Sequence, residues 1–215
     1  MSFSLSKYLN LRLLLSGLMG IVSGLPLMLT GGLLQAYMKA EGVDLSAIGL
    51  VSLLGLPYTL KFLWAPFLDR PIPLGRRKGW LFSSQICLLI SVFLLSLVKP
   101  GDSLTALMVC ALLVSFFSAN QDIVIDAYRR ETLEDRELGL GSSYYIYGYR
   151  VGMLISGAGG LILADKMGFP QVYLLMALSI IPFMILTLFL EEPKVPGLAV
   201  KAERGFLSPF KELWA

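Results

Sequence analysis

The amino-acid sequence predicts an all-α protein whose helices cross a membrane six times. Of its 215 residues, 56% are hydrophobic and only 15% are charged, and the mean hydropathy is +0.73. A soluble domain carries about 25% charged residues, because a surface in contact with water needs them. The apolar residues also gather in runs of roughly 18 or more, which is the length that a helix needs to cross the hydrocarbon core.

Six such runs follow one another, separated by short stretches rich in charged residues, glycine and proline. We expect spans over residues 11–37, 45–68, 79–98, 104–125, 140–163 and 172–190. They are expected to be helices, because open strands leave backbone groups unpaired in lipid. The first run is too long for the apolar part of a signal peptide and shows no A-x-A cleavage pattern.

These spans predict a division of the chain into two parts. Residues 1–192 are expected to form one six-span transmembrane bundle, and residues 193–215 a cytoplasmic linker. Within the linker, residues 206–214 have the pattern of a short amphipathic helix at the membrane surface. The same pattern also suits the approach to a further span.

Basic residues distinguish the two sides of the membrane. With the N-terminus inside, the inner segments hold thirteen Lys and Arg residues, whereas the outer loops hold three, Lys39, Lys99 and Lys166. Cytoplasmic loops carry the excess of positive charge in membrane proteins. We therefore expect both termini in the cytoplasm, which requires an even number of spans.

The composition excludes several kinds of site. There is no histidine, so a histidine metal site, general base or proton relay is excluded. Cys87 and Cys110 lie inside apolar runs and form no motif, so no disulfide framework is expected. No Ser/His or His-Glu-x-x-His protease motif is present, and we expect neither an enzyme nor a metal site.

Three charged residues lie deep inside the predicted spans, away from their ends: Lys61, Asp122 and Arg150. A charge at this depth costs several kcal/mol and marks either function or tight pairing. From the rise of a helix, Lys61 lies roughly 12 Å and Asp122 roughly 10 Å from the inner ends of their spans. At these depths the two side chains can face each other across neighbouring helices.

Further polar residues accompany this group. Asn120 and Gln121 precede Asp122, and Asp126 lies one turn further toward the cytoplasm on the same helical face. Tyr149 precedes Arg150, and its ring suits stacking on a sugar or peptide, although an interfacial aromatic belt also accounts for tyrosines here.

Two interpretations of these polar residues remain open. One is a polar cavity in which carboxylates bind a proton and cations bind an anionic substrate. The other is an ion-pair network that only determines helix packing. Because the chain lacks histidine, proton coupling would use a carboxylate, and Asp122 is the best placed.

The fifth predicted span has a face of small residues. Gly148, Gly152, Ser156 and Gly160 recur every four residues, a spacing that lets helices approach closely. We expect this face to serve helix packing, and in a moving transporter it can also be the surface on which two elements rock.

The loop between the second and third spans resembles the signature of the major facilitator superfamily. That signature is Asp-Arg followed by Gly-Arg-Arg or Gly-Arg-Lys, and here it consists of Asp69, Arg70, Gly75, Arg76 and Arg77. Four residues separate Arg70 from Gly75, whereas the usual signature has one. The resemblance implies that this loop is an inner gate held closed by ion pairs.

Three further stretches resemble the AmpG muropeptide permease family: LWAPFLDR over residues 63–70, ANQDIVIDAYR over residues 119–129 and GYRVGM over residues 148–153. This resemblance implies a transporter of the bacterial inner membrane that imports anhydro-muropeptides, driven by the proton gradient and without a cofactor. Such transporters have about twelve spans in two six-helix bundles around a central cavity. The chain would thus be the N-terminal half, with a second bundle, absent here, or a like chain as its partner.

Two alternatives accompany this interpretation. Acetyl-CoA transporters share much of the same signature, and a truncated, non-transporting membrane subunit would associate through the small-residue face of Gly148. The expected partners are otherwise membrane lipids and a small glycopeptide-like substrate, and no nucleic acid.

Overall fold

The computed structural model describes residues 10–70 and 72–193. Six helical segments are long and apolar enough to cross a membrane: Leu11–Ala40, Leu45–Leu63, Arg76–Leu97, Leu104–Thr132, Leu138–Met167 and Phe169–Phe189. All regular structure in these two described ranges is helical. The predicted all-α, six-span bundle is therefore confirmed. The expected linker lies, from residue 194 on, outside the described residues, as does the segment 206–214.

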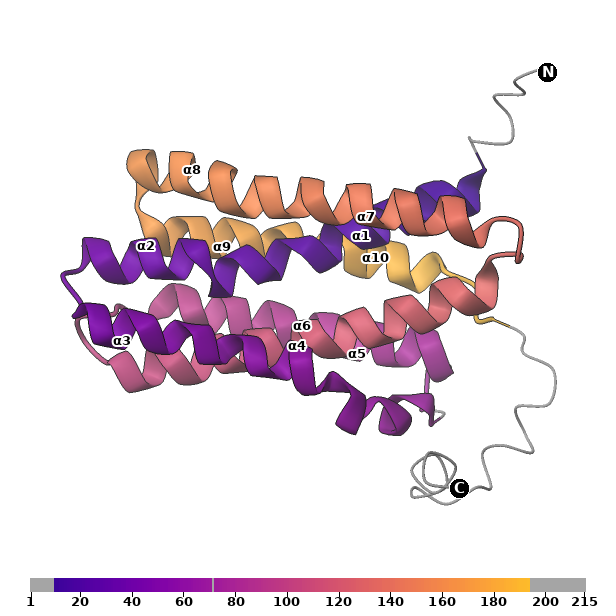
Figure 1. Cartoon of the computed structure of the whole chain (residues 1–215), viewed down its shortest axis with the longest axis horizontal. Helices are drawn as coiled ribbons and strands as arrows, with labels where there is room; N and C mark the ends of the chain where they lie inside the picture. Colours follow the sequence, from indigo (N-terminus) through magenta and orange to yellow (C-terminus); the bar gives the residue numbers. More distant parts are fainter. Residues whose placement is uncertain (1–9, 71, 194–215) are drawn as a thin grey trace.

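The spans run side by side along the long axis of the molecule (Figure 1). Their α-helices are α1 (Leu11–Thr30), α2 (Gly32–Ala40), α3 (Leu45–Gly49), α4 (Leu56–Leu60), α5 (Arg76–Leu97), α6 (Leu104–Thr132), α7 (Leu138–Leu154), α8 (Gly160–Met167), α9 (Phe169–Ser179) and α10 (Ile181–Phe189). The beginning of α1, the α6–α7 connection and the end of α10 share one end of the bundle, and the α2–α3 and α8–α9 turns share the other.

The second span differs from the uninterrupted helix that its apolar run predicts. Between α3 and α4 it contains a 3₁₀ segment, η2 (Leu50–Gly55), and after α4 it continues as η3 (Lys61–Leu63) and η4 (Ala65–Asp69). Pro57 and Pro66 stand in the first turn of α4 and η4. Proline has no N–H to donate to the preceding turn and fits the first turn of a new segment, so the chain restarts at both positions.

Three other spans are also interrupted within their length. The first bends at Gly31, between α1 and α2, and the fifth contains a π-helical turn, η5 (Ile155–Gly159). The sixth divides before Pro182, which is in the first turn of α10. Glycine, proline and π turns are the common causes of such kinks.

Every span except the second extends beyond a predicted end by two or more residues, and the third and fourth show this at the charged end of the bundle. The third begins at Arg76 rather than at residue 79, and the fourth continues to Thr132 rather than to residue 125. Hydropathy marks only where a helix meets lipid, whereas backbone hydrogen bonding continues into water. Side chains cap other starts: Asp44 accepts hydrogen bonds from the hydroxyl and backbone N–H of Ser46, and these lower the pKa of its carboxyl.

The closest packing in the bundle is between α1 and α7. A Cβ atom at Gly148 would lie 2.9 Å from the carbonyl carbon of Gly17, and one at Gly152 would lie 3.0 Å from the backbone nitrogen of Leu25. Gly24 of α1 has the same relation to the backbone of Tyr149. Backbone therefore packs directly on backbone, which only residues without large side chains permit.

Candidate functional site

Asp122 lies in the interior of the bundle, on α6. It is 6% exposed, and its Oδ1 atom is buried without a hydrogen bond to any described residue. Lys61 of η3 and Asp126 are close enough to interact electrostatically with its carboxylate. The hydroxyls of Tyr145 and Tyr149, on α7, are also within range of that charge. An ionised carboxylate at this depth is costly without a partner, so the position requires either a proton or a cation.

The two residues before Asp122 tie three spans together. Trp64, between η3 and η4, donates a hydrogen bond from Nε1 to Oδ1 of Asn120 over 2.5 Å. Gln121 donates from Nε2 to the carbonyl oxygen of Val22 in α1 over 3.1 Å. These bonds hold α6 against the first and second spans, and so they determine where Asp122 points.

Several more buried oxygens near this level have no hydrogen-bond partner among the described residues. They are Oγ of Ser23, Ser115 and Ser118, the hydroxyl of Tyr58 and Oε1 of Gln121. Some of them are neighbours, since Ser23 lies beside Asp122 and Ser118 lies beside Tyr58. Buried polar atoms are paired in most proteins, so small shifts of these side chains or a bound water would pair them. The first, second and fourth spans all contribute to this group of oxygens.

Arg150 lies elsewhere. Gly148 and Gly152 face α1, and Arg150 occupies the opposite, exposed side of α7. In the described ranges it forms no ion pair. The structure therefore brings Lys61 and Tyr149 toward Asp122 but does not bring Arg150 into that group, and a shared cavity for all of them remains a prediction.

Asp126 has a different environment from Asp122. Its side chain is 46% exposed and pairs with Arg129 over 3.1 Å. The guanidinium of Arg129 also lies over the ring of Tyr145, 4.5 Å from its centroid. Asp126 thus already has a cation one turn away, at the inner end of α6.

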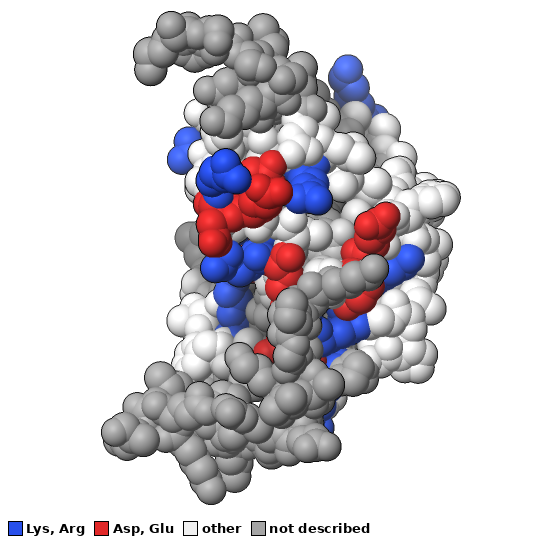
Figure 2. Space-filling model, turned by 90° about the vertical axis from the view of Figure 1, so that its right-hand side faces the viewer, with Lys and Arg blue, Asp and Glu red and all other residues white. Residues whose placement is uncertain are grey.

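The loop predicted as a gate forms a network of charges at the basic end of the bundle. Arg77 is 2.7 Å from Asp69 and 2.8 Å from Glu131, and Arg76 is 2.5 Å from Glu131. Both arginines are buried, whereas Arg70 is exposed and lies 5.6 Å from the ring centroid of Phe67. Figure 2 views this end of the molecule and shows acidic and basic side chains interspersed across it. The network connects the second–third loop to the end of α6.

Two acidic residues in this network were missed by the sequence analysis. One is Glu131, and the other is Glu192, which accepts hydrogen bonds from the backbone N–H groups of Arg77 (2.8 Å) and Lys78 (2.9 Å). Gly75 has a φ of 104°, and a Cβ there would lie 2.7 Å from a carboxylate oxygen of Glu192. A carboxylate at the start of α5 suits the positive end of that helix. Their separation from the loop by 54 to 115 residues left no local signal.

The small-residue face of the fifth span is covered within the chain. Gly148 and Gly152 pack on the backbone of α1, Gly160 packs on Leu33 and Val172, and Ser156 donates to the carbonyl oxygen of Gly152 over 3.0 Å. This face is therefore unavailable to a separate partner subunit, contrary to the alternative in which the chain associates through it.

Comparison with known proteins agrees with the bundle and the loop. Residues 16–215 match the model of the Major Facilitator Superfamily. The chain belongs to the major facilitator superfamily. As a member of that family with six apolar spans, it is a multi-pass membrane protein.

Individual relatives show which members of the superfamily the chain is similar to. The chain is 46% identical over 179 residues to the anhydromuropeptide permease of Escherichia coli (strain K12), a match that covers 82% of this chain and 36% of the permease. It is 45% identical over 199 residues to an uncharacterised protein of Haemophilus influenzae, covering 91% and 47%. It is 36% identical over 177 residues to putative transporter AmpG 1 of Rickettsia bellii, covering 79% and 43%. The resemblance to the AmpG family is thus confirmed, and the chain spans between a third and a half of these relatives.

Proposed function

We propose that this chain is part of a secondary transporter, not an enzyme, that imports anhydromuropeptides across the bacterial inner membrane together with protons. The strongest support is the buried carboxylate of Asp122 in a chain that is 46% identical over 179 residues to a protein named anhydromuropeptide permease. The segregation of basic residues supports an orientation with both termini in the cytoplasm.

Asp122 is the proposed proton-binding group. Its carboxylate has no hydrogen bond from the described residues at Oδ1, and Lys61 is a cation near enough to act on it. When Asp122 binds a proton, Lys61 is released from that attraction and becomes available to an anionic substrate. Binding of proton and substrate is thereby linked, because each changes the charge that the other meets.

The substrate would lie beside Asp122, in a cavity that a second six-helix bundle completes. A muropeptide carries carboxylates and sugar rings. Lys61 and Arg150 suit the carboxylates through charge-assisted hydrogen bonds, and the ring of Tyr149 suits a sugar face. Arg150 is exposed on α7, so its guanidinium would be accessible to a ligand or to the opposite bundle. The network of Arg76, Arg77 and Glu131 would hold the inner gate closed during part of the cycle.

A chimaera tests the proposal. The 179 matching residues of the Escherichia coli permease are replaced by those of this chain, and uptake of labelled anhydromuropeptide is measured in vesicles with and without a proton gradient. We expect concentrative uptake that a protonophore abolishes. A folded chimaera that equilibrates no substrate in either condition contradicts the proposed transport.

Two substitutions separate coupling from binding. Asp122→Asn, which cannot release a proton, is expected to lose gradient-driven accumulation, whereas Asp126→Asn is expected to retain it because Asp126 already pairs with Arg129. Normal, gradient-dependent uptake by Asp122→Asn would remove Asp122 from the coupling role.

A further inference from the structure

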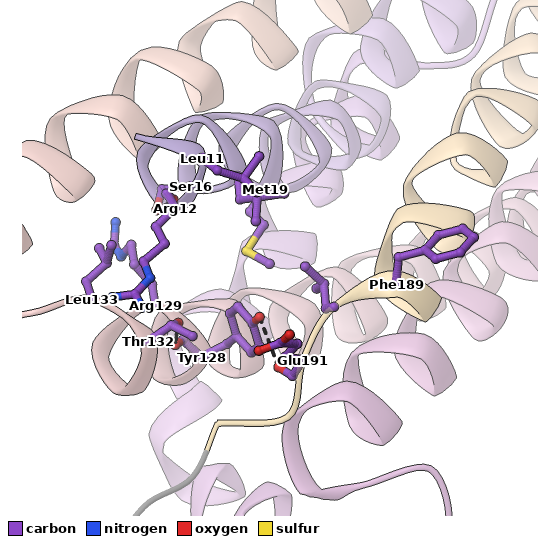
Figure 3. Close-up of a pocket in the computed structure, with 12 residues that line it drawn as sticks. Leu11, Arg12, Ser16, Met19, Tyr128, Arg129, Thr132, Leu133, Phe189 and Glu191 are labelled. Carbon is purple, nitrogen blue, oxygen red and sulfur yellow. Dashed lines mark hydrogen bonds between the residues drawn. The ribbon is translucent and has the colours of Figure 1, made fainter. Parts of the chain in front are cut away.

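A cavity of about 330 Å³ lies between α1, the end of α6 and the end of α10. None of the residues around Asp122 line it, and neither does the charged network of the second–third loop. Figure 3 shows Arg12 projecting from α1 toward the end of α6, where Arg129 lies, while Met19 points into the space between the two helices. Its volume is at the lower end of the range for small-molecule pockets, about 300–1,000 Å³.

The cavity lies at one end of the bundle, where three membrane-spanning segments begin or end. Arg12 is in the first turn of α1, Arg129 is in the last turn of α6, and Glu191 follows the end of α10. The outer rim is strongly apolar: Leu11 is 70% exposed and Phe189 is 81% exposed. The cavity is thus lined by both charged and apolar side chains, and all of them lie at the ends of three membrane-spanning segments.

The charges of the cavity are of both signs and are incompletely paired. Arg129 borders the cavity, with Nη2 bonded to Asp126 and its guanidinium over the ring of Tyr145, while its buried Nη1 has no hydrogen-bond partner in residues 10–70 and 72–193. Arg12 approaches Glu134 and Glu137 only to 3.9 and 4.0 Å, which is too long for a hydrogen bond.

Across the cavity, the side chain of Glu191 forms no ion pair with a described residue. Its backbone is held in place, because its carbonyl oxygen accepts a hydrogen bond from the hydroxyl of Tyr128 over 3.1 Å. The wall formed by α1 and α6 therefore presents two arginines, each with carboxylates nearby, and the end of α10 presents a carboxylate that has no ion pair with a described residue.

We propose that this cavity binds the headgroup of a phospholipid that carries both a phosphate and a primary ammonium, as phosphatidylethanolamine does. The phosphate lies against Arg12 and Arg129, and the ammonium donates hydrogen bonds to Glu191. Basic pockets between membrane helices bind lipid phosphates, and arginine suits a phosphate oxygen pair. The acyl chains leave past Phe189, which precedes Glu191 on the membrane side of the headgroup.

Glu191 selects among headgroups. A headgroup with a phosphate but no cation, such as phosphatidylglycerol, leaves this carboxylate unpaired beside a second negative charge. Phosphatidylcholine supplies a cation but no N–H group. Of these three headgroups, only ethanolamine satisfies both walls of the cavity.

Native mass spectrometry of the full chain in detergent tests this site, with the three lipids supplied on identical acyl chains. Wild-type protein is expected to bind phosphatidylethanolamine at least about fivefold more tightly than the other two lipids. Arg12→Gln is expected to weaken this binding about fivefold, as for one basic group near a lipid surface. Glu191→Gln is expected to remove the preference over phosphatidylcholine while it preserves affinity for phosphatidylcholine. Both side chains are exposed, so neither variant perturbs the core.

The matched control is Arg130→Gln, which makes the same charge change at the same end of the bundle. Arg130 is 66% exposed, pairs with Asp135 and does not line the cavity. Equal losses in Arg12→Gln and Arg130→Gln would overturn the proposal, as would equal affinity for the three lipids. Displacement of the lipid by glycerophosphoethanolamine or inorganic phosphate at the same concentration would make this a site for a soluble phosphate instead. Transport activity is not part of this test, so its outcome is independent of the proposed function.

Discussion

The substitution Gly148→Ala adds one methyl group at the tightest contact of the bundle. Its Cβ would lie 2.9 Å from the carbonyl carbon of Gly17 and 3.1 Å from the backbone nitrogen of Ile21, with the carbonyl oxygen of Gly17 closer still. Carbon atoms in contact are about 3.5–4.0 Å apart. Because the obstacle is backbone rather than a movable side chain, and the carbonyl oxygen is the nearest atom, α1 and α7 must separate by about 1 Å.

The cost follows from the contacts that this separation loosens. A gap of about 0.5–1 Å forfeits between a quarter and a half of each contact, and each contact contributes about 0.1–0.2 kcal/mol. For a seam with about as many contacts as one buried leucine, 40–60, the loss is roughly 2–3 kcal/mol, in line with overpacking in other cores. The better helix propensity of alanine returns up to about 1 kcal/mol, so we expect a net loss of about 1–2 kcal/mol.

Gly139→Ala is the matched control, because Gly139 is in the same helix and an added Cβ there meets no atom within 4 Å. It is expected to be neutral or to stabilise by up to about 1 kcal/mol. Reversible unfolding of both variants in mixed micelles measures the difference, expected near 2 kcal/mol, or about 30-fold in the ratio of folded to unfolded protein. Equal stabilities of the two variants would refute the close approach of α1 and α7.

Three other predictions concern the polar contacts. Glu131→Gln leaves Arg76 and Arg77, both buried, with the exposed Asp69 as their remaining partner, and is expected to destabilise the fold by about 3 kcal/mol. Glu134→Gln, in an exposed pair at 3.9 Å, is the control and is expected to cost less than about 0.5 kcal/mol. Thermal unfolding compares the two variants. Glu192→Gln weakens two backbone hydrogen bonds at the start of α5 and is expected to cost about 1 kcal/mol; hydrogen exchange at the first turn of α5 should accelerate, and unchanged exchange there contradicts that role. Trp64→Phe leaves Oδ1 of Asn120 without its donor and is expected to cost about 1–2 kcal/mol; a melting temperature equal to wild type would show that this bond contributes nothing.

Much of the fold is predictable from the sequence because hydropathy is a local property. Each apolar run is long enough to span the membrane, and all six appear as spans. The interruptions were harder to predict. Pro57 and Pro66 are visible in the sequence, yet proline is tolerated in membrane helices, and only the structure shows that the chain restarts at both as short 3₁₀ and α segments.

The candidate site was only partly predictable. Asp122 is conspicuous because a carboxylate inside an apolar run is rare, and the structure places it in the interior. The depth of a residue along its helix does not say, however, toward which neighbouring helix its side chain points. Lys61 approaches Asp122, whereas Arg150 projects from the far side of α7, and the difference depends on how α7 is rotated against α1.

The sequence alone determines the number of spans, their helical nature and the separation of basic residues between the two sides. These properties depend only on residues close together in the chain. The tertiary structure decides which partners meet. Glu131 joins Arg76 and Arg77, and Glu192 caps α5, across 54 to 115 residues. The small residues of α7 likewise pack closely only because α1 also has glycines at the contact. Such contacts arise only when whole helices pack, because packing, and not any local preference, brings distant side chains within bonding distance.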